Sequence, residues 1–279
     1  MSIKPVAVIT GAGGGMGAAC ARRLANTHTL ILTDFNSARL DATAFALREE
    51  ENADISATIC GDIADDAVVS QIVQAADTAG GGCKALIHTA GLSPALAPWQ
   101  PIITTNLVGT EKLLAAFEAL LTPGFVGVVL SSTARLYVPP AGEALASLLA
   151  RPLASDLLKQ LEPQLGDGEA TRATNAYAYT KAWVCNTVQQ RATRWASHGA
   201  RIVSLSPGFI RTAMTIKEVE DRPEMRALLD STPVSRWGTV SDIVNLVEFI
   251  LSDKASFITG TDIVIDGGLS ARLLTQPRA

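Results

Sequence analysis

The sequence has few cysteines, little net charge and no long apolar run. Its four cysteines, Cys20, Cys60, Cys83 and Cys185, are scattered, so no pair has the spacing typical of zinc ligands. This pattern predicts reduced thiols and no metal site. The net charge of −4 argues against binding to a nucleic-acid backbone. No apolar run approaches the roughly 20 residues of a transmembrane helix, so we expect no membrane span.

The N-terminus offers no room for a signal peptide, because the first expected strand begins at Val6. Together with the reduced thiols, this predicts a cytoplasmic protein. A chain of 279 residues with 48% hydrophobic content can form one large α/β domain without a second core.

Short apolar runs with the length of buried strands recur along the chain. Most are continuous, as expected for parallel strands covered on both faces. The predicted strands are Val6–Thr10, Leu30–Asp34, Ile55–Cys60, Ala85–Thr89, Val126–Ser131, Ile202–Ser206 and Ile263–Ile265. Helical segments separate them, starting near Gly15, Ala38, Asp65, Pro101, Asn175 and Thr239. Repeated β-α-β units predict a single doubly wound Rossmann-type α/β domain over residues 1–279, with a seven-stranded parallel sheet.

The first expected strand ends in a glycine-rich turn that opens a helix. Such a turn allows close backbone approach to a pyrophosphate, which the helix N-terminus attracts. A flexible loop without a ligand is the alternative. However, Asp34 ends the next strand at about the offset where an acid meets the 2′-hydroxyl of a ribose. The sequence therefore favours a dinucleotide site, and the carboxylate favours NAD because it would repel the 2′-phosphate of NADP.

Tyr177 and Lys181 are four residues apart in a segment that we expect to be helical, so they share one face. A nearby ammonium favours the phenolate and lowers the pKa of a tyrosine, which produces an acid/base suited to proton exchange with an alcohol. Tyr179 has Trp183 at the equivalent position, so it is not the expected acid/base.

The spacing of Thr10, Gly11, Gly15 and Gly17, followed by the Tyr177–Lys181 pair, resembles the short-chain dehydrogenase/reductase family over nearly the whole chain. The resemblance implies an NAD-dependent oxidoreductase that interconverts a secondary alcohol and a ketone, each a small molecule, by hydride transfer.

Four residues match the family's catalytic positions. The resemblance implies that Tyr177 is the acid/base, Lys181 its activator and ribose contact, and Ser132 the anchor of the substrate oxygen. Asn106 opens an N-x-x-G pattern and would hold a proton-relaying water, although a solvent-facing asparagine is the alternative. Asp62 would contact the adenine, or cap a helix.

The implied cofactor contacts are spread over the whole chain. They are Gly11, Gly13, Gly14, Gly15, Met16, Gly17, Asp34, Asp62, Ile63, Ala90, Gly91, Tyr177, Lys181, Pro207, Gly208, Ile210 and Thr212. Two residues depart from the family pattern. We interpret His88 as a packed structural residue, and Arg135 as a solvated arginine or a pocket residue that favours an acidic substrate.

The segment between Ser132 and Tyr177 is much longer than in much of the family. In this insertion, residues 138–174, two short amphipathic helices are expected, one with Leu145, Leu148 and Leu149, the other with Leu153, Leu157 and Leu161. A comparable insertion marks bacterial 3α-hydroxysteroid dehydrogenase/carbonyl reductases, which implies a hydroxysteroid or another bulky apolar substrate and disfavours small sugars. Residues 212–231 mix apolar and charged side chains, and the resemblance makes them a substrate lid.

The segment Thr239–Leu251 is apolar on more sides than one sheet can cover. We therefore expect a homodimer through this helix and the strand Ile263–Ile265, with a tetramer as the alternative. Two functional rivals stay open. One is a cofactor-binding sensor without catalysis, and the other is an enoyl reductase, whose tyrosine and lysine are more widely spaced.

Overall fold

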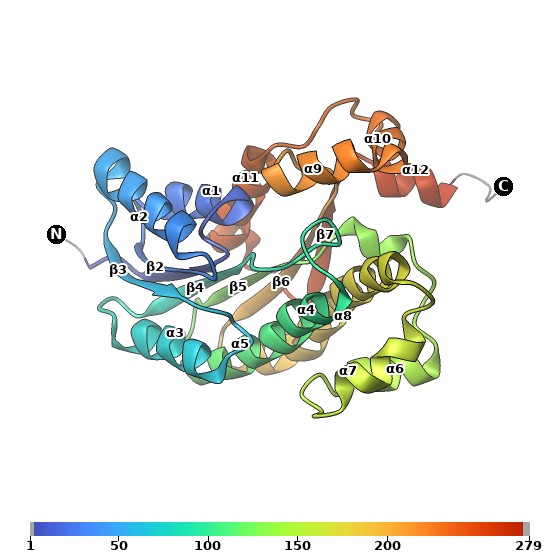
Figure 1. The fold of residues 1–279 in the computed structure, drawn as a ribbon. Helices are drawn as coiled ribbons and strands as arrows, with labels where there is room; N and C mark the ends of the chain where they lie inside the picture. Colours follow the sequence, from blue (N-terminus) through green and yellow to red (C-terminus); the bar gives the residue numbers. More distant parts are fainter. Residues whose placement is uncertain (1–2, 276–279) are drawn as a thin grey trace.

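The computed structural model describes residues 3–275 and contains one seven-stranded parallel sheet. The strand order is β3-β2-β1-β4-β5-β6-β7, which confirms the predicted doubly wound fold (Figure 1). The strands are β1 (Val6–Thr10), β2 (Thr29–Asp34), β3 (Ile55–Cys60), β4 (Cys83–His88), β5 (Val126–Leu130), β6 (Arg201–Pro207) and β7 (Thr261–Ile265). β1 and β5 are buried along their whole length, and β2, β4 and β6 at all but one residue each, because helices cover both faces of the sheet.

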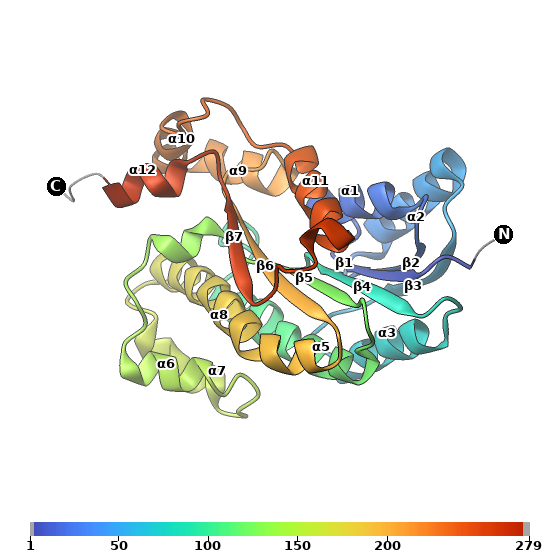
Figure 2. The same ribbon diagram turned by 180° about the vertical axis from the view of Figure 1, so that it is seen from behind.

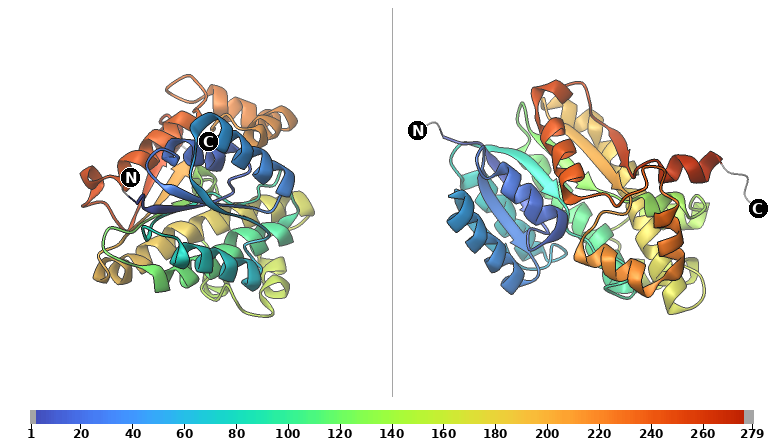
Figure 3. Two further views of the ribbon diagram at one scale, coloured as in Figure 1. Left: turned by 90° about the vertical axis from the view of Figure 1, so that its left-hand side faces the viewer. Right: turned by 90° about the horizontal axis from the view of Figure 1, so that it is seen from above.

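Three layers are visible when the sheet is seen edge-on or from behind (Figures 2 and 3). One face is covered by α1 (Gly15–Leu24), α2 (Ser37–Glu51) and α11 (Val240–Leu251). The other face is covered by α3 (Asp66–Thr78), α5 (Thr110–Phe117) and α8 (Glu169–Ser197). Each face has its own apolar core, built around Leu30 and Ile243 on the first face and around Phe117 and Trp195 on the second.

The strand order reverses at β1, which lies between β2 and β4. The connections that leave β1 and β4 run to opposite faces of the sheet, so a crevice opens at the carboxyl ends of these strands. Ligands bind at such a switch point in open α/β sheets.

The helix predicted to start near Pro101 is interrupted. It consists of α4 (Trp99–Ile103), a π-helical turn (Thr104–Gly109), α5 and a short 3₁₀ turn (Glu118–Leu120). No apolar pattern distinguishes a π-helical turn from an α-helix, and such turns are frequent at functional sites.

The insertion contains α6 (Glu143–Leu149) and α7 (Leu157–Leu161), which lie beside α8 and away from the sheet (Figure 1). Five of the six leucines expected to pack inward are buried: Leu145, Leu148, Leu149, Leu157 and Leu161. Leu153 is exposed because it precedes α7 instead of lying on it. α8 begins at Glu169, earlier than the predicted start near Asn175, and takes in the last residues of the predicted insertion.

Residues 212–231 form a helical pair, α9 (Ala213–Asp221) and α10 (Pro223–Asp230). Thr212 caps α9, and the fixed backbone angle of Pro223 suits the first turn of α10. The pair lies over the carboxyl edge of the sheet, beside α12 (Leu269–Thr275) (Figure 1). Within residues 3–275, every helix is too short or too polar to span a bilayer.

Candidate active site

The glycine turn between β1 and α1 is closed so tightly that a side chain has no room at two positions. Gly11 has a φ of +69°, which favours glycine, and a Cβ at Gly17 would lie 2.2 Å from the carbonyl oxygen of Gly11. This close approach of α1 to β1 leaves the first N–H groups of the helix facing the crevice.

Asp34 is held by the glycine turn at the end of β2. Its Oδ2 accepts a hydrogen bond from the Gly13 N–H (2.9 Å) and its Oδ1 accepts one from the Asn36 N–H (2.9 Å). A Cβ at Gly13 would lie 2.8 Å from the Asp34 carboxyl carbon. Arg39 lines the same end of the cavity, and sequence reasoning missed it because α2 turns it back toward β2.

Asp62 follows β3, and its Oδ1 accepts a hydrogen bond from the Ala64 N–H (2.9 Å). It does not cap α3: that cap is Asp65, which accepts from the Ala67 N–H. Asp62 instead stabilises the turn that carries it and Ile63 to the cavity wall.

Asn106 is buried in the π-helical turn, so the solvent-facing alternative is wrong. Its Oδ1 accepts a hydrogen bond from the Leu92 N–H (2.8 Å), and its Nδ2 donates one to the Leu92 carbonyl (2.9 Å). A Cβ at Gly91 would lie 3.1 Å from Asn106 Oδ1 and 3.4 Å from Lys181 Nζ. The bare backbone of Gly91 therefore lets the amide and the ammonium come together.

Tyr177 and Lys181 share one face of α8, and Lys181 Nζ lies 5.8 Å from the centre of the Tyr177 ring. Lys181 Nζ also donates a hydrogen bond to the Leu130 carbonyl (2.8 Å), which fixes the ammonium at the end of β5. The Ser132 side chain lines the same cavity as Tyr177. Tyr179 is buried in the apolar core of the second face.

The expected lowering of the Tyr177 pKa is not observed. Burial raises the pKa of Tyr177 to about 12, and a hydrogen bond with Ser132 acts in the opposite direction. Burial also lowers the pKa of Lys181 to about 8, because a buried ammonium loses its hydration. In this structure desolvation is the largest influence on the pKa of both groups.

His88 is a structural residue. Hydrogen bonds join its Nδ1 to Thr10 Oγ1 (2.7 Å) and its Nε2 to Thr110 Oγ1 (2.9 Å), so the ring connects β1, β4 and α5. Burial lowers the pKa of His88 to about 3, with the charge of Lys181 adding to the effect. The neutral ring has a hydroxyl partner on each nitrogen.

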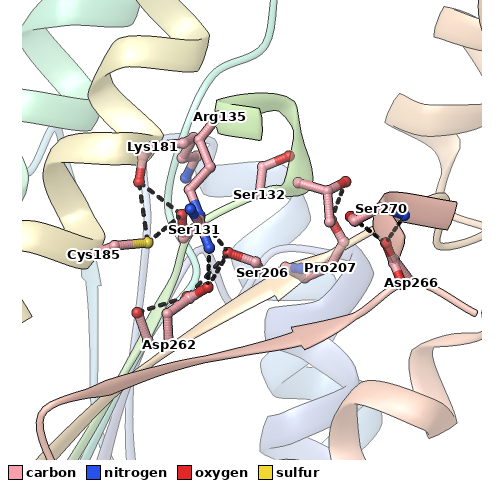
Figure 4. Close-up of polar contacts among 12 residues, drawn as sticks. Ser131, Ser132, Arg135, Lys181, Cys185, Ser206, Pro207, Asp262, Asp266 and Ser270 are labelled. Atoms are coloured by element: carbon pink, nitrogen blue, oxygen red, sulfur yellow. Dashed lines mark hydrogen bonds and ion pairs between the residues drawn. The ribbon is translucent and has the colours of Figure 1, made fainter. Parts of the chain in front are cut away.

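Arg135 is neither solvated nor directed into the cavity. Its Nη2 lies 2.7 Å from Asp262 Oδ2 and its Nε donates to Ser206 Oγ (3.2 Å) (Figure 4). Asp262 also accepts hydrogen bonds from Ser204 and Ser206. This network ties the turn after Ser132 to β6 and β7, while Ser132 itself lies outside the dashed contacts of Figure 4.

One cavity of about 1650 Å³ joins these groups along the carboxyl edge of the sheet. Among its lining residues are Gly11, Gly13, Gly14, Gly15, Met16, Asp34, Asp62, Ile63, Ala90, Gly91, Ser132, Tyr177, Pro207, Gly208, Ile210 and Thr212. Gly17, Asn106 and Lys181 lie behind this lining. The helix α9 closes the far end with Met214 and Glu218, which sequence reasoning did not single out. In the part of the chain that the structure describes, no cluster of side chains has the composition of a metal site.

The comparisons with known proteins point in one direction. The family model described as short chain dehydrogenase matches residues 5–140, and the model described as enoyl-(acyl carrier protein) reductase matches residues 164–270. The short-chain dehydrogenase/reductase bsc3 of Alternaria brassicicola is 32% identical over 95% of this chain and 96% of its own length. The galactitol 2-dehydrogenase (L-tagatose-forming) of Cereibacter sphaeroides is 28% identical over 94% of this chain and 93% of its own.

A solved structure extends the likeness to three dimensions. The 3-alpha-hydroxysteroid dehydrogenase from Pseudomonas sp. B-0831, complexed with NADH, superposes with a TM-score of 0.77 at 25% identity. The match covers 98% of this chain and all of that one (100%). The likeness therefore includes both the nucleotide half and the half that carries α9 and α10.

Proposed function

The chain belongs to the short-chain dehydrogenase/reductase family, and we propose that it is an NAD-dependent oxidoreductase that interconverts a secondary alcohol and a ketone. The observation that carries this proposal is the meeting of Ser132 and Tyr177 at one cavity whose other end is the glycine turn, with Lys181 held behind the lining next to the Tyr177 ring. A dinucleotide would extend between these two ends.

The nucleotide end of the cavity fits the cofactor. The tight approach of Gly17 to Gly11 leaves a cradle of backbone N–H groups for a pyrophosphate, and Asp34 offers carboxylate oxygens to the 2′-hydroxyl of a ribose. The nicotinamide end would be held by Pro207, Gly208, Ile210 and Thr212. Between the two ends, the cofactor would be contacted by Asp62, Ile63, Ala90 and Gly91. When bound, the cofactor supplies hydride chemistry.

The chain's own residues supply proton transfer and positioning. Ser132 Oγ donates a hydrogen bond to the substrate oxygen, and Tyr177 takes the hydroxyl proton during oxidation or returns it during reduction. Lys181 favours the phenolate and contacts a ribose hydroxyl. Asn106, held against Leu92 and close to Lys181, positions the water that passes the proton onward.

The substrate end favours a bulky alcohol with an apolar body, such as a hydroxysteroid. Apolar side chains line this end, from the loop after β4 and from the helical pair: Leu92, Leu96, Met214, Met225 and Leu228. We assign the helical pair α9–α10 as the substrate lid. A cytoplasmic location and a homodimer are part of the same proposal.

A panel of secondary alcohols with NAD⁺ tests the proposed activity by the absorbance of the reduced nicotinamide. Tyr177→Phe keeps the ring and removes the proton carrier, so we expect nearly all turnover to be lost while NAD binding is kept. The matched control, Tyr179→Phe, should have a mild effect. No turnover of any alcohol by the wild-type chain would favour the non-catalytic sensor instead. Reduction of a carbon–carbon double bond, but not of ketones, would favour the enoyl reductase.

A further inference from the structure

Glu218 places a carboxylate in the wall of the substrate end of the cavity. It lies on α9, its side chain is 21% exposed, and Met214, Met225 and Leu228 line the same region. Its cationic neighbour is Arg222, whose Nη1 lies 3.6 Å from Glu218 Oε1. This distance is too long for a hydrogen bond. Within residues 3–275 the Glu218 carboxylate accepts no hydrogen bond.

Glu218 shares its ion-pair partner Arg222 with a second carboxylate. Arg222 Nε donates to Glu224 Oε1 at 2.8 Å, so this guanidinium is engaged by a second carboxylate. Lys217, which also lines the cavity, is paired with Asp221 at 2.7 Å. The five side chains together carry one negative charge, and the oxygens of Glu218 are the acceptors left open at the cavity wall.

Glu218 also acts on the reacting end of the cavity. Its negative charge raises the pKa of Tyr177, and burial raises the pKa of Glu218 itself. The first effect places the Glu218 carboxylate within electrostatic reach of the phenol, and the second reflects its burial, which the charge of Arg222 opposes. A ligand group that donates a hydrogen bond to Glu218 would relieve the cost of its burial.

We propose that Glu218 determines specificity by accepting a hydrogen bond from a second donor group of the substrate, at a site away from the reacting carbon. The proposal rests on the proposed function. The substrate class is then a secondary alcohol with an apolar body and a distal hydroxyl or ammonium group. A distal carboxylate is disfavoured, because it would meet the like charge of Glu218 while the Arg222 guanidinium is already paired with Glu224.

Cyclohexanols that differ in one distal group test this class directly. With NAD⁺, we expect the kcat/KM for cyclohexane-1,4-diol to exceed that for 4-hydroxycyclohexanecarboxylate by at least about tenfold, one step of 1.4 kcal/mol. Glu218→Gln should bring the two values within about threefold of each other. The matched control is Glu220→Gln on the same helix, where the side chain is exposed, and it should keep the wild-type preference. A third alcohol, 4-aminocyclohexanol, separates the two donors. If Glu218→Gln lowers kcat/KM for the amino alcohol alone, the donor is an ammonium. If it lowers kcat/KM for the diol in parallel, the donor is a hydroxyl.

A binding measurement that needs no turnover separates this proposal from the proposed function. The NAD⁺-saturated Tyr177→Phe protein, in which we expect turnover to be lost and NAD binding to be kept, is mixed with 4-hydroxycyclohexanone or 4-oxocyclohexanecarboxylate, and the shift in Tm is recorded with and without the added Glu218→Gln substitution. Stronger stabilisation by the hydroxy ketone, lost in Glu218→Gln, supports the site even if no alcohol is oxidised. Equal stabilisation by both ketones, or none by either, overturns it. An unchanged preference in Glu218→Gln overturns it as well, even if the enzyme is active.

The pH dependence of kcat/KM distinguishes this role of Glu218 from a merely structural one, which would leave the profile unchanged. Tyr177 is faced by Ser132, by Lys181 and by Glu218, while His88 behind Lys181 is neutral. The other charges near Glu218 are the paired Arg222, Glu224, Lys217 and Asp221, and Arg135 is engaged by Asp262. Removal of the Glu218 charge lowers the pKa of Tyr177, so the rise of kcat/KM for alcohol oxidation with pH should begin at lower pH in Glu218→Gln. An unmoved profile contradicts the coupling.

Discussion

Ser131 and Ser132 are neighbours at the end of β5, yet their hydroxyls lie on opposite sides of the strand. Ser131 Oγ donates a hydrogen bond to the Lys181 carbonyl of α8 at 2.7 Å and is buried. Ser132 Oγ lies at the cavity and accepts a hydrogen bond from the Ala134 N–H at 3.1 Å. The alternation of side chains along a strand separates a structural hydroxyl from one that can meet a substrate.

The two serines should therefore respond differently to removal of the hydroxyl. We expect Ser132→Ala to lower kcat/KM by about 100-fold, as is typical when one donor to the reacting oxygen is lost. Ser131→Ala should instead lower the free energy of unfolding by about 1 kcal/mol, the usual contribution of one buried hydrogen bond. Steady-state kinetics and urea unfolding of both variants distinguish the roles. Greater loss of activity in Ser131→Ala would show that Ser131, and not Ser132, meets the substrate.

The buried ring of His88 predicts a loss of stability in acid. The pKa of His88 is about 3 in the folded chain and near 6.5 when the chain is unfolded, so the unfolded state binds more protons between these values. Stability from the neutral ring is complete above pH 6.5 and falls by roughly 1.4 kcal/mol for each pH unit below about 6.

Urea unfolding at pH 7 and pH 5 measures this effect. His88→Asn removes the titrating ring, so its unfolding free energy should depend less on pH than that of the wild type. The matched control is His198→Gln, where the ring is exposed, and it should keep the wild-type dependence. An equal acid dependence in the wild type and in His88→Asn would exclude the buried ring as its source.

The sheet and the glycine turn could be predicted from the sequence because they depend on local patterns. Continuous apolar runs identify strands covered on both faces, and the glycines after Thr10 identify a turn with close backbone approach. The role of Arg135 could not be predicted in this way, because its partner Asp262 is 127 residues further along the chain. The raised pKa of Tyr177 depends on burial and on the charge of Glu218 from α9, which no spacing between Tyr177 and Lys181 reveals.

Asp34 predicts a preference for NAD over NADP of at least about tenfold in kcat/KM, one step of 1.4 kcal/mol. Its two carboxylate oxygens are fixed by the N–H groups of Gly13 and Asn36, so the charge cannot turn away from a 2′-phosphate. Asp34→Ala should weaken the preference, since Arg39 at the same end of the cavity would then attract the phosphate. Kinetics with both cofactors test this in the wild type, in Asp34→Ala and in Asp34→Ala with Arg39→Ala. Equal constants for NAD and NADP in the wild type would refute the assignment.

The predicted homodimer requires an apolar surface on α11 and β7, and three side chains supply one. Phe249 on α11, Phe257 before β7 and Val264 on β7 are exposed, and β7 is the edge strand of the sheet (Figure 2). An edge strand and an apolar patch that meet their own copies about a two-fold axis would both be covered. Val247, although on α11, faces the core and is buried, so a charge there would test folding and not association.

Charges on the exposed side chains test the dimer directly. We expect the wild type to have twice the monomer mass by light scattering in dilute solution, and Phe257→Asp with Val264→Asp to have the mass of a monomer. The control is Leu158→Asp on the exposed side of α7 in the insertion, which should leave the dimer intact. A wild-type monomer would refute the assembly. A dimer that survives the β7 charges but dissociates in Leu158→Asp would move the interface to the insertion, where α6 and α7 lie beside α8 (Figure 1).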